Sequence, residues 1–120
     1  MSHVVTIETK ARDPAAIAAA CHRLGLNAPV QGTAQLYSGE ATGLLVHLPG
    51  WQYPVVIDTG TGEVRYDNFG GRWGAQEHLD RFLQIYAVEM TKLQARKKGY
   101  QISEQALQDG GIQLQIIEGN

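Results

Sequence analysis

The stretch that decides the fold runs from Thr33 to Asp67 and reads TAQLYSGEATGLLVHLPGWQYPVVIDTGTGEVRYD. It contains four short runs of the kind that forms strands, because β-branched and aromatic residues recur in them. The runs are Thr33–Ser38, Thr42–Leu48, Tyr53–Asp58 and Glu63–Asp67. Every separator between them contains glycine, and the separator at Pro49 also contains proline, which is turn chemistry. Because these connections are short, we predict that the strands pair antiparallel as a meander.

Helical patterns flank this stretch on both sides. Asp13 and Pro14 begin the first helix, since aspartate caps free N–H groups and proline at the first helical position loses no hydrogen bond. Gly25 ends this helix, and Gly99 ends a second one that is predicted over Ala75–Lys98. The second helix carries one apolar stripe with a period of about 3.6 residues. Its members are Leu79, Phe82, Leu83, Tyr86, Met90 and Leu93.

Further strands are predicted near both ends of the chain. Val4–Lys10 alternates as a strand, and Gln101–Leu107 and Ile112–Ile117 flank the turn signal Gln108-Asp109-Gly110-Gly111 as a hairpin with one buried face. The element order is therefore β-α-β-β-β-β-α-β-β. This order predicts an α+β fold in which two helices pack on one face of an antiparallel sheet.

Size and composition indicate one domain spanning residues 1–120, because 120 residues is an ordinary domain length. The formal net charge is −2, which argues against a nucleic-acid partner. The apolar runs are too short to span a bilayer, and no signal-peptide pattern opens the chain. With a single cysteine, no internal disulfide is expected. These features together predict a cytoplasmic protein that does not enter a membrane.

The segment Asp67-Asn68-Phe69-Gly70-Gly71-Arg72-Trp73-Gly74 joins the last meander strand to the long helix. Glycines open backbone conformations that other residues avoid, and aromatic residues and arginine are the types that dominate binding contacts. Together with a tryptophan in an earlier loop, this segment supplies the candidate contact residues. They are Trp51, Asp67, Phe69, Arg72 and Trp73. If the two tryptophans approach each other, they form an exposed apolar patch or close one end of the core.

No catalytic or metal-binding set emerges from the sequence. Cys21 falls on the predicted inner face of the first helix, where a free cysteine behaves as a small apolar residue. Asp58, Glu63 and Asp67 lie around one predicted hairpin and either converge or form a solvated rim. The histidines are scattered singly, at His3, His22, His47 and His78, and neither Ser38 nor Ser103 lies in a glycine-flanked elbow. We therefore expect no catalytic residue, no metal and no cofactor, and we favour a binding protein over an enzyme.

Weak motifs over nearly the whole chain resemble one family. The matching positions are Met1-Ser2-His3, Ile7, Thr9, Asp13, Tyr86-Ala87, Gly99 and Asp109-Gly110-x-Ile112-x-Leu114. In them the chain resembles the uncharacterised proteins named after hypothetical chloroplast reading frame thirty-five, a domain-of-unknown-function family. The middle, with Gly39–Gly43 and Pro49-Gly50-Trp51, is more similar to its bacterial branch. The family has no established activity or catalytic residues, so the resemblance assigns none to this chain. It implies an accessory or adaptor role beside AAA-type ATPases.

Two main hypotheses follow. The first is a protein-binding or self-associating domain that acts through Trp51, Phe69, Arg72 and Trp73, with the edges of the final hairpin adding strand pairing between copies. The alternative is a small-molecule or anion-binding domain, with or without catalysis, in which Asp67 and Arg72 act at the start of the long helix. A weaker third hypothesis is RNA binding through Arg96-Lys97-Lys98, a basic run that the helix dipole already explains.

Overall fold

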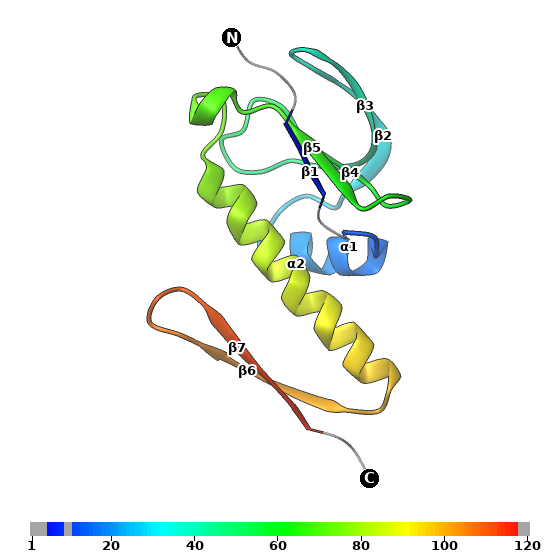
Figure 1. Ribbon diagram of the computed structural model, residues 1–120, viewed down its shortest axis with the longest axis vertical. Helices are drawn as coiled ribbons and strands as arrows, with labels where there is room; N and C mark the ends of the chain where they lie inside the picture. Colours follow the sequence, from blue (N-terminus) through cyan, green and yellow to red (C-terminus); the bar gives the residue numbers. More distant parts are fainter. Residues whose placement is uncertain (1–4, 9–10, 118–120) are drawn as a thin grey trace.

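The computed structural model describes residues 5–8 and 11–117 and confirms the α+β fold and its element order. A five-stranded antiparallel sheet, two helices and a separate two-stranded sheet make up the molecule (Figure 1). The elements are β1 (Val5–Glu8), α1 (Pro14–Arg23), β2 (Val30–Leu36), β3 (Gly39–Val46), β4 (Val55–Asp58), β5 (Glu63–Tyr66), the 3-10 turn η1 (Phe69–Gly71), α2 (Gln76–Lys97), β6 (Gln101–Ala106) and β7 (Ile112–Ile117). The outer residues of the predicted strand Val4–Lys10, namely Val4, Thr9 and Lys10, fall outside the described residues.

The predicted meander is confirmed. The strand order in the larger sheet is β1-β5-β4-β3-β2, so β2 to β5 pair in sequence and β1 adds beside β5. β1 runs antiparallel to β5, with Val5 opposite Tyr66. The first strand of the chain is therefore an edge strand, next to the last strand of the meander.

Three of the meander strands start at other residues than predicted, and for β4 the start is Val55 rather than Tyr53. β2 begins at Val30 rather than Thr33, and β3 begins at Gly39 rather than Thr42. Leu36 lies opposite Gly39, so the turn consists of Tyr37 and Ser38 alone. Residues 39–41, which lie between two predicted strands, and residues 30–32, which precede the predicted start of β2, were wrongly predicted outside strands, because cross-strand pairing outweighed the local preference of glycine for turns.

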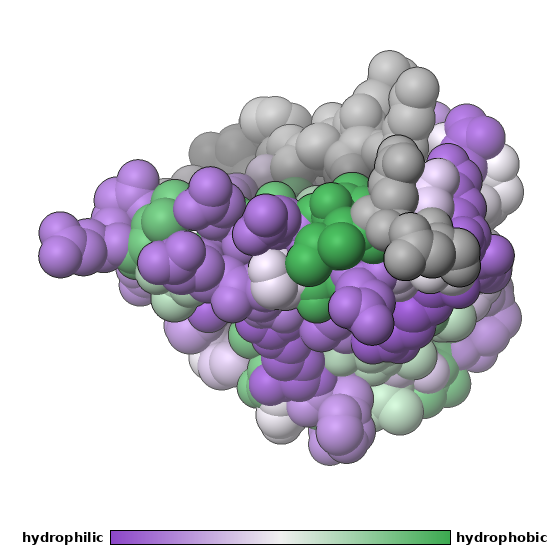
Figure 2. Space-filling model, turned by 90° about the horizontal axis from the view of Figure 1, so that it is seen from below, coloured by the Kyte–Doolittle hydropathy of each residue, from purple (hydrophilic) through white to green (hydrophobic). Residues whose placement is uncertain are grey.

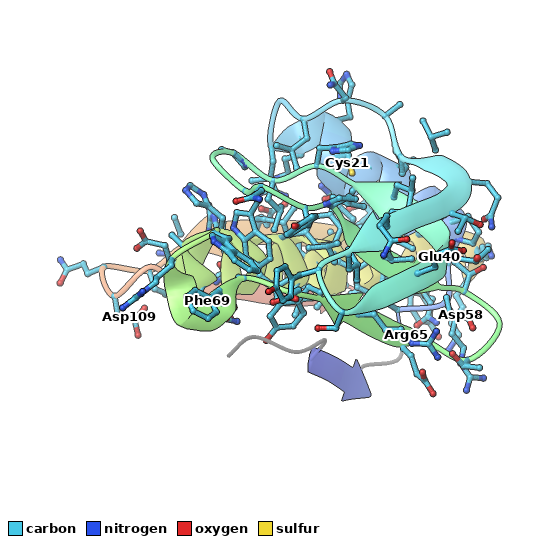
Figure 3. The ribbon with its side chains drawn as sticks, turned by 90° about the horizontal axis from the view of Figure 1, so that it is seen from above. Cys21, Glu40, Asp58, Arg65, Phe69 and Asp109 are labelled. Atoms are coloured by element: carbon cyan, nitrogen blue, oxygen red, sulfur yellow. The ribbon has the colours of Figure 1, made fainter. Side chains whose placement is uncertain are left out.

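Both helices cover one face of the five-stranded sheet and bury the main core there. Asp13 caps α1 by accepting from the amide groups of Ala15 (2.9 Å) and Ala16 (3.3 Å). Cys21 on α1 is 0 % exposed and unpaired with any other cysteine, in line with the predicted inner face (Figure 3). The main core combines Ile17 and Cys21 of α1, Val46, Val55, Ile57 and Val64 of the sheet, and Leu79, Phe82 and Ile85 of α2.

A smaller core lies on the opposite face of the sheet. Val56 alternates with Val55 and Ile57 along β4 and packs with Leu36 and Ala41. The β2–β3 hairpin curves (Figure 1). The close approach of β3 to β4 needs glycine at position 43, because a Cβ atom there would lie 2.4 Å from the carbonyl oxygen of Ile57. The sheet is thus curled, with apolar groups on both faces.

The final hairpin forms a sheet of its own and lies on the other side of α2 from the five-stranded sheet (Figure 1). Ion pairs hold its inner face: Glu104 of β6 contacts Arg23 of α1 and Lys92 of α2 (3.2 Å), and Arg23 also contacts Glu89 (3.1 Å). The predicted buried face is only partly realised, since Ile112 and Leu114 are half-buried and Ile116 is exposed. The radius of gyration of 15.3 Å exceeds the roughly 14 Å of a compact chain of this length, consistent with an elongated shape.

The ion pairs give the hairpin a pH-dependent attachment. Hydrogen bonding to Arg23, followed by that to Lys92, lowers the pKa of Glu104 below its ordinary value of 4.5. The carboxylate therefore stabilises the folded hairpin above that value, and this contribution is lost as the pH falls below it. We expect Glu104→Gln to weaken hairpin amide protection by about 1 kcal/mol or less at neutral pH.

Hydrogen exchange followed by NMR measures this effect. The difference between wild type and Glu104→Gln should vanish as the pH falls, because the wild-type carboxyl becomes protonated. Glu40→Gln is the matched control, since Glu40 is exposed and makes no ion pair with a described residue. A difference that persists unchanged at low pH would contradict this explanation.

Burial also predicts the reactivity of the single cysteine. Desolvation raises the pKa of the Cys21 thiol to about 11, so almost no thiolate forms at neutral pH. We expect iodoacetamide to label the native protein far more slowly than the denatured protein, as measured by intact mass. Rapid labelling of the native chain would show that α1 opens readily.

Candidate functional site

The connection between β5 and α2 has an unusual backbone. Phe69, Gly70 and Gly71 follow one another with φ angles of 48°, 61° and 101°. Among the described residues, Phe69 is the one non-glycine residue with a positive φ. For a bulky side chain this conformation costs about 1–2 kcal/mol. Such strain persists only where the surrounding structure enforces it, and it is common at functional sites.

Asn68 is the residue that enforces the loop. Its carbonyl oxygen accepts from the amide groups of Gly71 (3.0 Å) and Trp73 (2.9 Å). Its buried side-chain amide donates to the Gly74 carbonyl (3.2 Å) and to the side-chain oxygen of Gln76 (3.2 Å). Asn68 was not among the predicted site residues, although an asparagine before a pair of turn glycines is a local signal for such a role.

Trp73 lies at the centre of a cluster of aromatic rings. Its ring stacks on Phe69 at a centroid distance of 4.7 Å, and the rings of Tyr37 and Tyr53 lie 5.1 Å and 5.6 Å away. The guanidinium carbon of Arg72 lies 5.2 Å from the centroid of the Phe69 ring, within cation–π range. We call Tyr37, Tyr53, Phe69, Arg72 and Trp73 the aromatic patch.

The aromatic patch draws on three separate segments: the β2–β3 turn, the chain before β4 and the β5–α2 connection. Tyr37 is 59 % exposed and Arg72 is exposed, whereas the other three members are half-buried. Sequence reasoning missed Tyr37, because a lone tyrosine in a turn gives no sign of its distant partners. Its signal was an exposed aromatic residue at a hairpin tip.

Trp51 has a different environment from Trp73. Its ring lies 5.6 Å from that of Tyr66, and its indole nitrogen donates to the carbonyl of Ala75 (3.0 Å). It also packs against the main core and against the backbone of Gly74. Trp51 therefore fixes the start of α2 from the helix side and does not belong to the aromatic patch.

Asp67 lies behind the patch rather than on the surface. It is 1 % exposed, and one carboxylate oxygen accepts from the amide of Phe69 at 3.4 Å. The other oxygen has no hydrogen-bond partner among the residues that the structure describes. Of the candidate contact residues, the structure thus brings Phe69, Arg72 and Trp73 together at the surface and places Asp67 and Trp51 beneath or beside them.

The three carboxylates of the meander do not converge. Asp58 and Glu63 lie opposite each other where β4 meets β5, whereas Asp67 follows the far end of β5. Asp58 accepts from the Gly60 amide (2.9 Å) in its own turn, and Glu63 pairs with Arg65 (2.9 Å). Figure 3 shows Asp58 and Arg65 at the opposite end of the molecule from Phe69. Asp58 and Glu63 therefore lie at the rim of the sheet, whereas Asp67 is buried at its other end.

Other kinds of site find little support in the described residues. Where the structure describes side chains, no three histidine, cysteine or acidic residues are grouped to hold a metal ion. No helix in that part of the chain is both long and apolar enough to cross a bilayer. The start of α2 lacks a side-chain cap but has Glu77 in its first turn, which opposes the binding of an anion.

Comparisons with known proteins identify no relative: no family model, no curated protein and no solved structure matches the chain. The case for a function therefore rests on the geometry of the aromatic patch.

The close packing of Trp51 on Gly74 gives a stability prediction. A Cβ atom at position 74 would lie 2.4 Å from the Trp51 ring, so Gly74→Ala should destabilise the fold by about 1–3 kcal/mol through overpacking. Thermal or denaturant unfolding measures this. The matched control is Gly32→Ala, whose added Cβ meets Leu45 at an ordinary 3.5 Å. An equal loss in the two variants would contradict the role of Trp51.

Proposed function

We propose that this domain is a cytoplasmic adaptor that binds a segment of a partner protein on the aromatic patch. One observation carries the proposal: Trp73 gathers three other rings around it at the surface, on a loop that holds Phe69 in a strained backbone conformation. Tryptophan, tyrosine and arginine are the residues most enriched in binding hot spots.

The patch is organised before any partner arrives. The Asn68 side chain links the loop to Gln76 at the start of α2, and the backbone N–H of Gln52 donates to the Trp73 carbonyl at 2.8 Å. Rings that are already held in place lose little conformational entropy on binding. A preformed, partly exposed aromatic surface therefore suits partner recognition better than a loop that must first fold.

Arg72 indicates the chemistry of the partner. Its guanidinium lies over the Phe69 ring and makes no ion pair with any described residue. An arginine in this state is available to a carboxylate on the partner, which it can bind through two parallel hydrogen bonds. The best-fitting partner is a protein segment that places an acidic residue beside apolar side chains.

The resemblance to the bacterial branch of the chloroplast reading-frame family suggests a class of partner. It favours an accessory role beside an AAA-type ATPase, and we include such an ATPase among the proposed partners. The alternative, anion or small-molecule binding by Asp67 and Arg72, has less support, because Asp67 is buried behind Phe69 and Glu77 adds negative charge to the helix start.

Two substitutions test the patch without emptying the core. Arg72→Ala removes the exposed cation, and Phe69→Gly removes the ring while relieving the positive φ. Lost ring stacking and relieved strain are each worth about 1 kcal/mol, so Phe69→Gly should change stability by about 1 kcal/mol or less. Each substitution should weaken partner binding at least about tenfold, which is about 1.4 kcal/mol.

The partner is first identified by photo-cross-linking in the host cell from a benzoylphenylalanine placed at position 37, and its affinity is then measured by calorimetry. Val30→Ala is the matched control, because Val30 is 61 % exposed and lies outside the patch. Unchanged affinity in both patch variants would overturn the proposal. Unfolding of the Phe69→Gly chain would assign the ring a structural role instead.

A further inference from the structure

The β6–β7 hairpin is a two-stranded sheet whose outer strand edges have no partner strand among the described residues. Two-stranded hairpins are marginally stable unless a further strand or a packed layer supports them. Here both helices support one face: Arg23 of α1 and Lys92 of α2 pair with Glu104, and Gln84 of α2 donates a hydrogen bond to the Gly110 carbonyl (3.0 Å). The edges themselves remain unpaired.

The β7 edge lacks the features by which proteins normally protect a free edge. Ile112–Ile117 reads IQLQII and contains no charged residue and no proline. Charges, proline and bulges are the usual protection against pairing with another chain. Ile116 and Ile117 are each 48 % exposed, and Figure 2, which views this end of the molecule, shows hydrophobic side chains bordered by polar ones.

The other neutral edge of the molecule is less suited to pairing. β2 carries no charge either, but it belongs to the curled β2–β3 hairpin (Figure 1). A curved edge presents its backbone groups in a poor line for a second strand. β6, the other edge of the hairpin, carries Glu104, which is committed to Arg23 and Lys92.

We propose that two copies of this chain associate through antiparallel pairing of their β7 strands. This surface is separate from the aromatic patch, so the inference goes beyond the proposed adaptor function. The product is a four-stranded sheet in the order β6-β7-β7-β6, with an α2 helix from each copy on the same face.

The sequence of β7 is complementary to itself in this arrangement. With the two-fold axis at Leu114, Ile112 of one copy lies opposite Ile116 of the other, and Gln113 lies opposite Gln115. Apolar residues thus meet apolar residues on the inner face, and uncharged amides meet amides on the outer face. No like charges oppose each other, and the two-fold symmetry closes the assembly at a dimer.

The dimer should be reversible. A strand edge of 6 residues buries little surface, whereas stable interfaces bury about 1,200–2,000 Å² in total. We therefore expect sedimentation velocity to show a concentration-dependent monomer–dimer equilibrium between micromolar and millimolar protein. A strict monomer over this range would overturn the proposal.

Charge substitutions locate the interface. Gln113 and Gln115 are exposed, so replacing both by lysine, or both by glutamate, should leave the hairpin folded. Either double variant alone should dimerise at least about tenfold more weakly, because like charges then face each other across the axis. Mixing the Gln113→Lys/Gln115→Lys chain with the Gln113→Glu/Gln115→Glu chain should restore a dimer, since each lysine then faces a glutamate.

Matched controls separate this edge from the others. Ser103→Lys/Gln105→Lys places the same charges on the same outer face but on β6, and should leave dimerisation unchanged. Gln31→Lys/Thr33→Lys places two lysines on β2 and should also leave dimerisation unchanged. Loss of the dimer in the β2 variant, or failure of the mixed chains to reassociate, would overturn the assignment to β7.

Discussion

The arrangement of the whole molecule depends on the burial of α2 between its two sheets. Leu79, Phe82 and Ile85 are fully buried against the five-stranded sheet and α1. Farther along the same helix, Glu89 and Lys92 join the ion pairs that hold the hairpin. Gln84 lies between Phe82 and Ile85 in the sequence and contacts the hairpin turn, so the two sheets pack on different sides of the same 22-residue helix. One element therefore positions both candidate surfaces.

The start of α2 connects this packing to the aromatic patch. Trp51 contacts the Gly74 backbone from the helix side of the sheet, while Trp73, one residue before that glycine, turns toward Tyr37 and Tyr53 on the other side. The positive φ angles at Phe69, Gly70 and Gly71 shape the turn that leads from β5 to Trp73. Strain at Phe69 is thus tied to placing the rings at the surface.

The sequence predicted the elements that depend on local patterns. α2 was expected over Ala75–Lys98 and extends over Gln76–Lys97, because a long stripe with a helical period leaves little ambiguity. Prediction from the sequence failed where pairing with a distant strand residue decides the secondary structure: Gly39 is a strand residue because it lies opposite Leu36. The same limit applies to the site. Phe69, Arg72 and Trp73 are neighbours in sequence and were found together, whereas Tyr37 joins them only through the curl of the sheet.

The two proposed surfaces are compatible with each other. In Figure 1 the β5–α2 connection lies above the start of α2, whereas the β6–β7 hairpin lies below the helix, and no residue of the aromatic patch belongs to β7, so pairing of β7 strands leaves the patch of each copy uncovered. A dimer then presents two patches to one target. When a target carries two copies of the recognised segment, as a symmetric oligomeric assembly does, the second contact becomes intramolecular and strengthens a weak single contact. The proposed self-association and the proposed binding patch would therefore reinforce each other on a partner that repeats one segment.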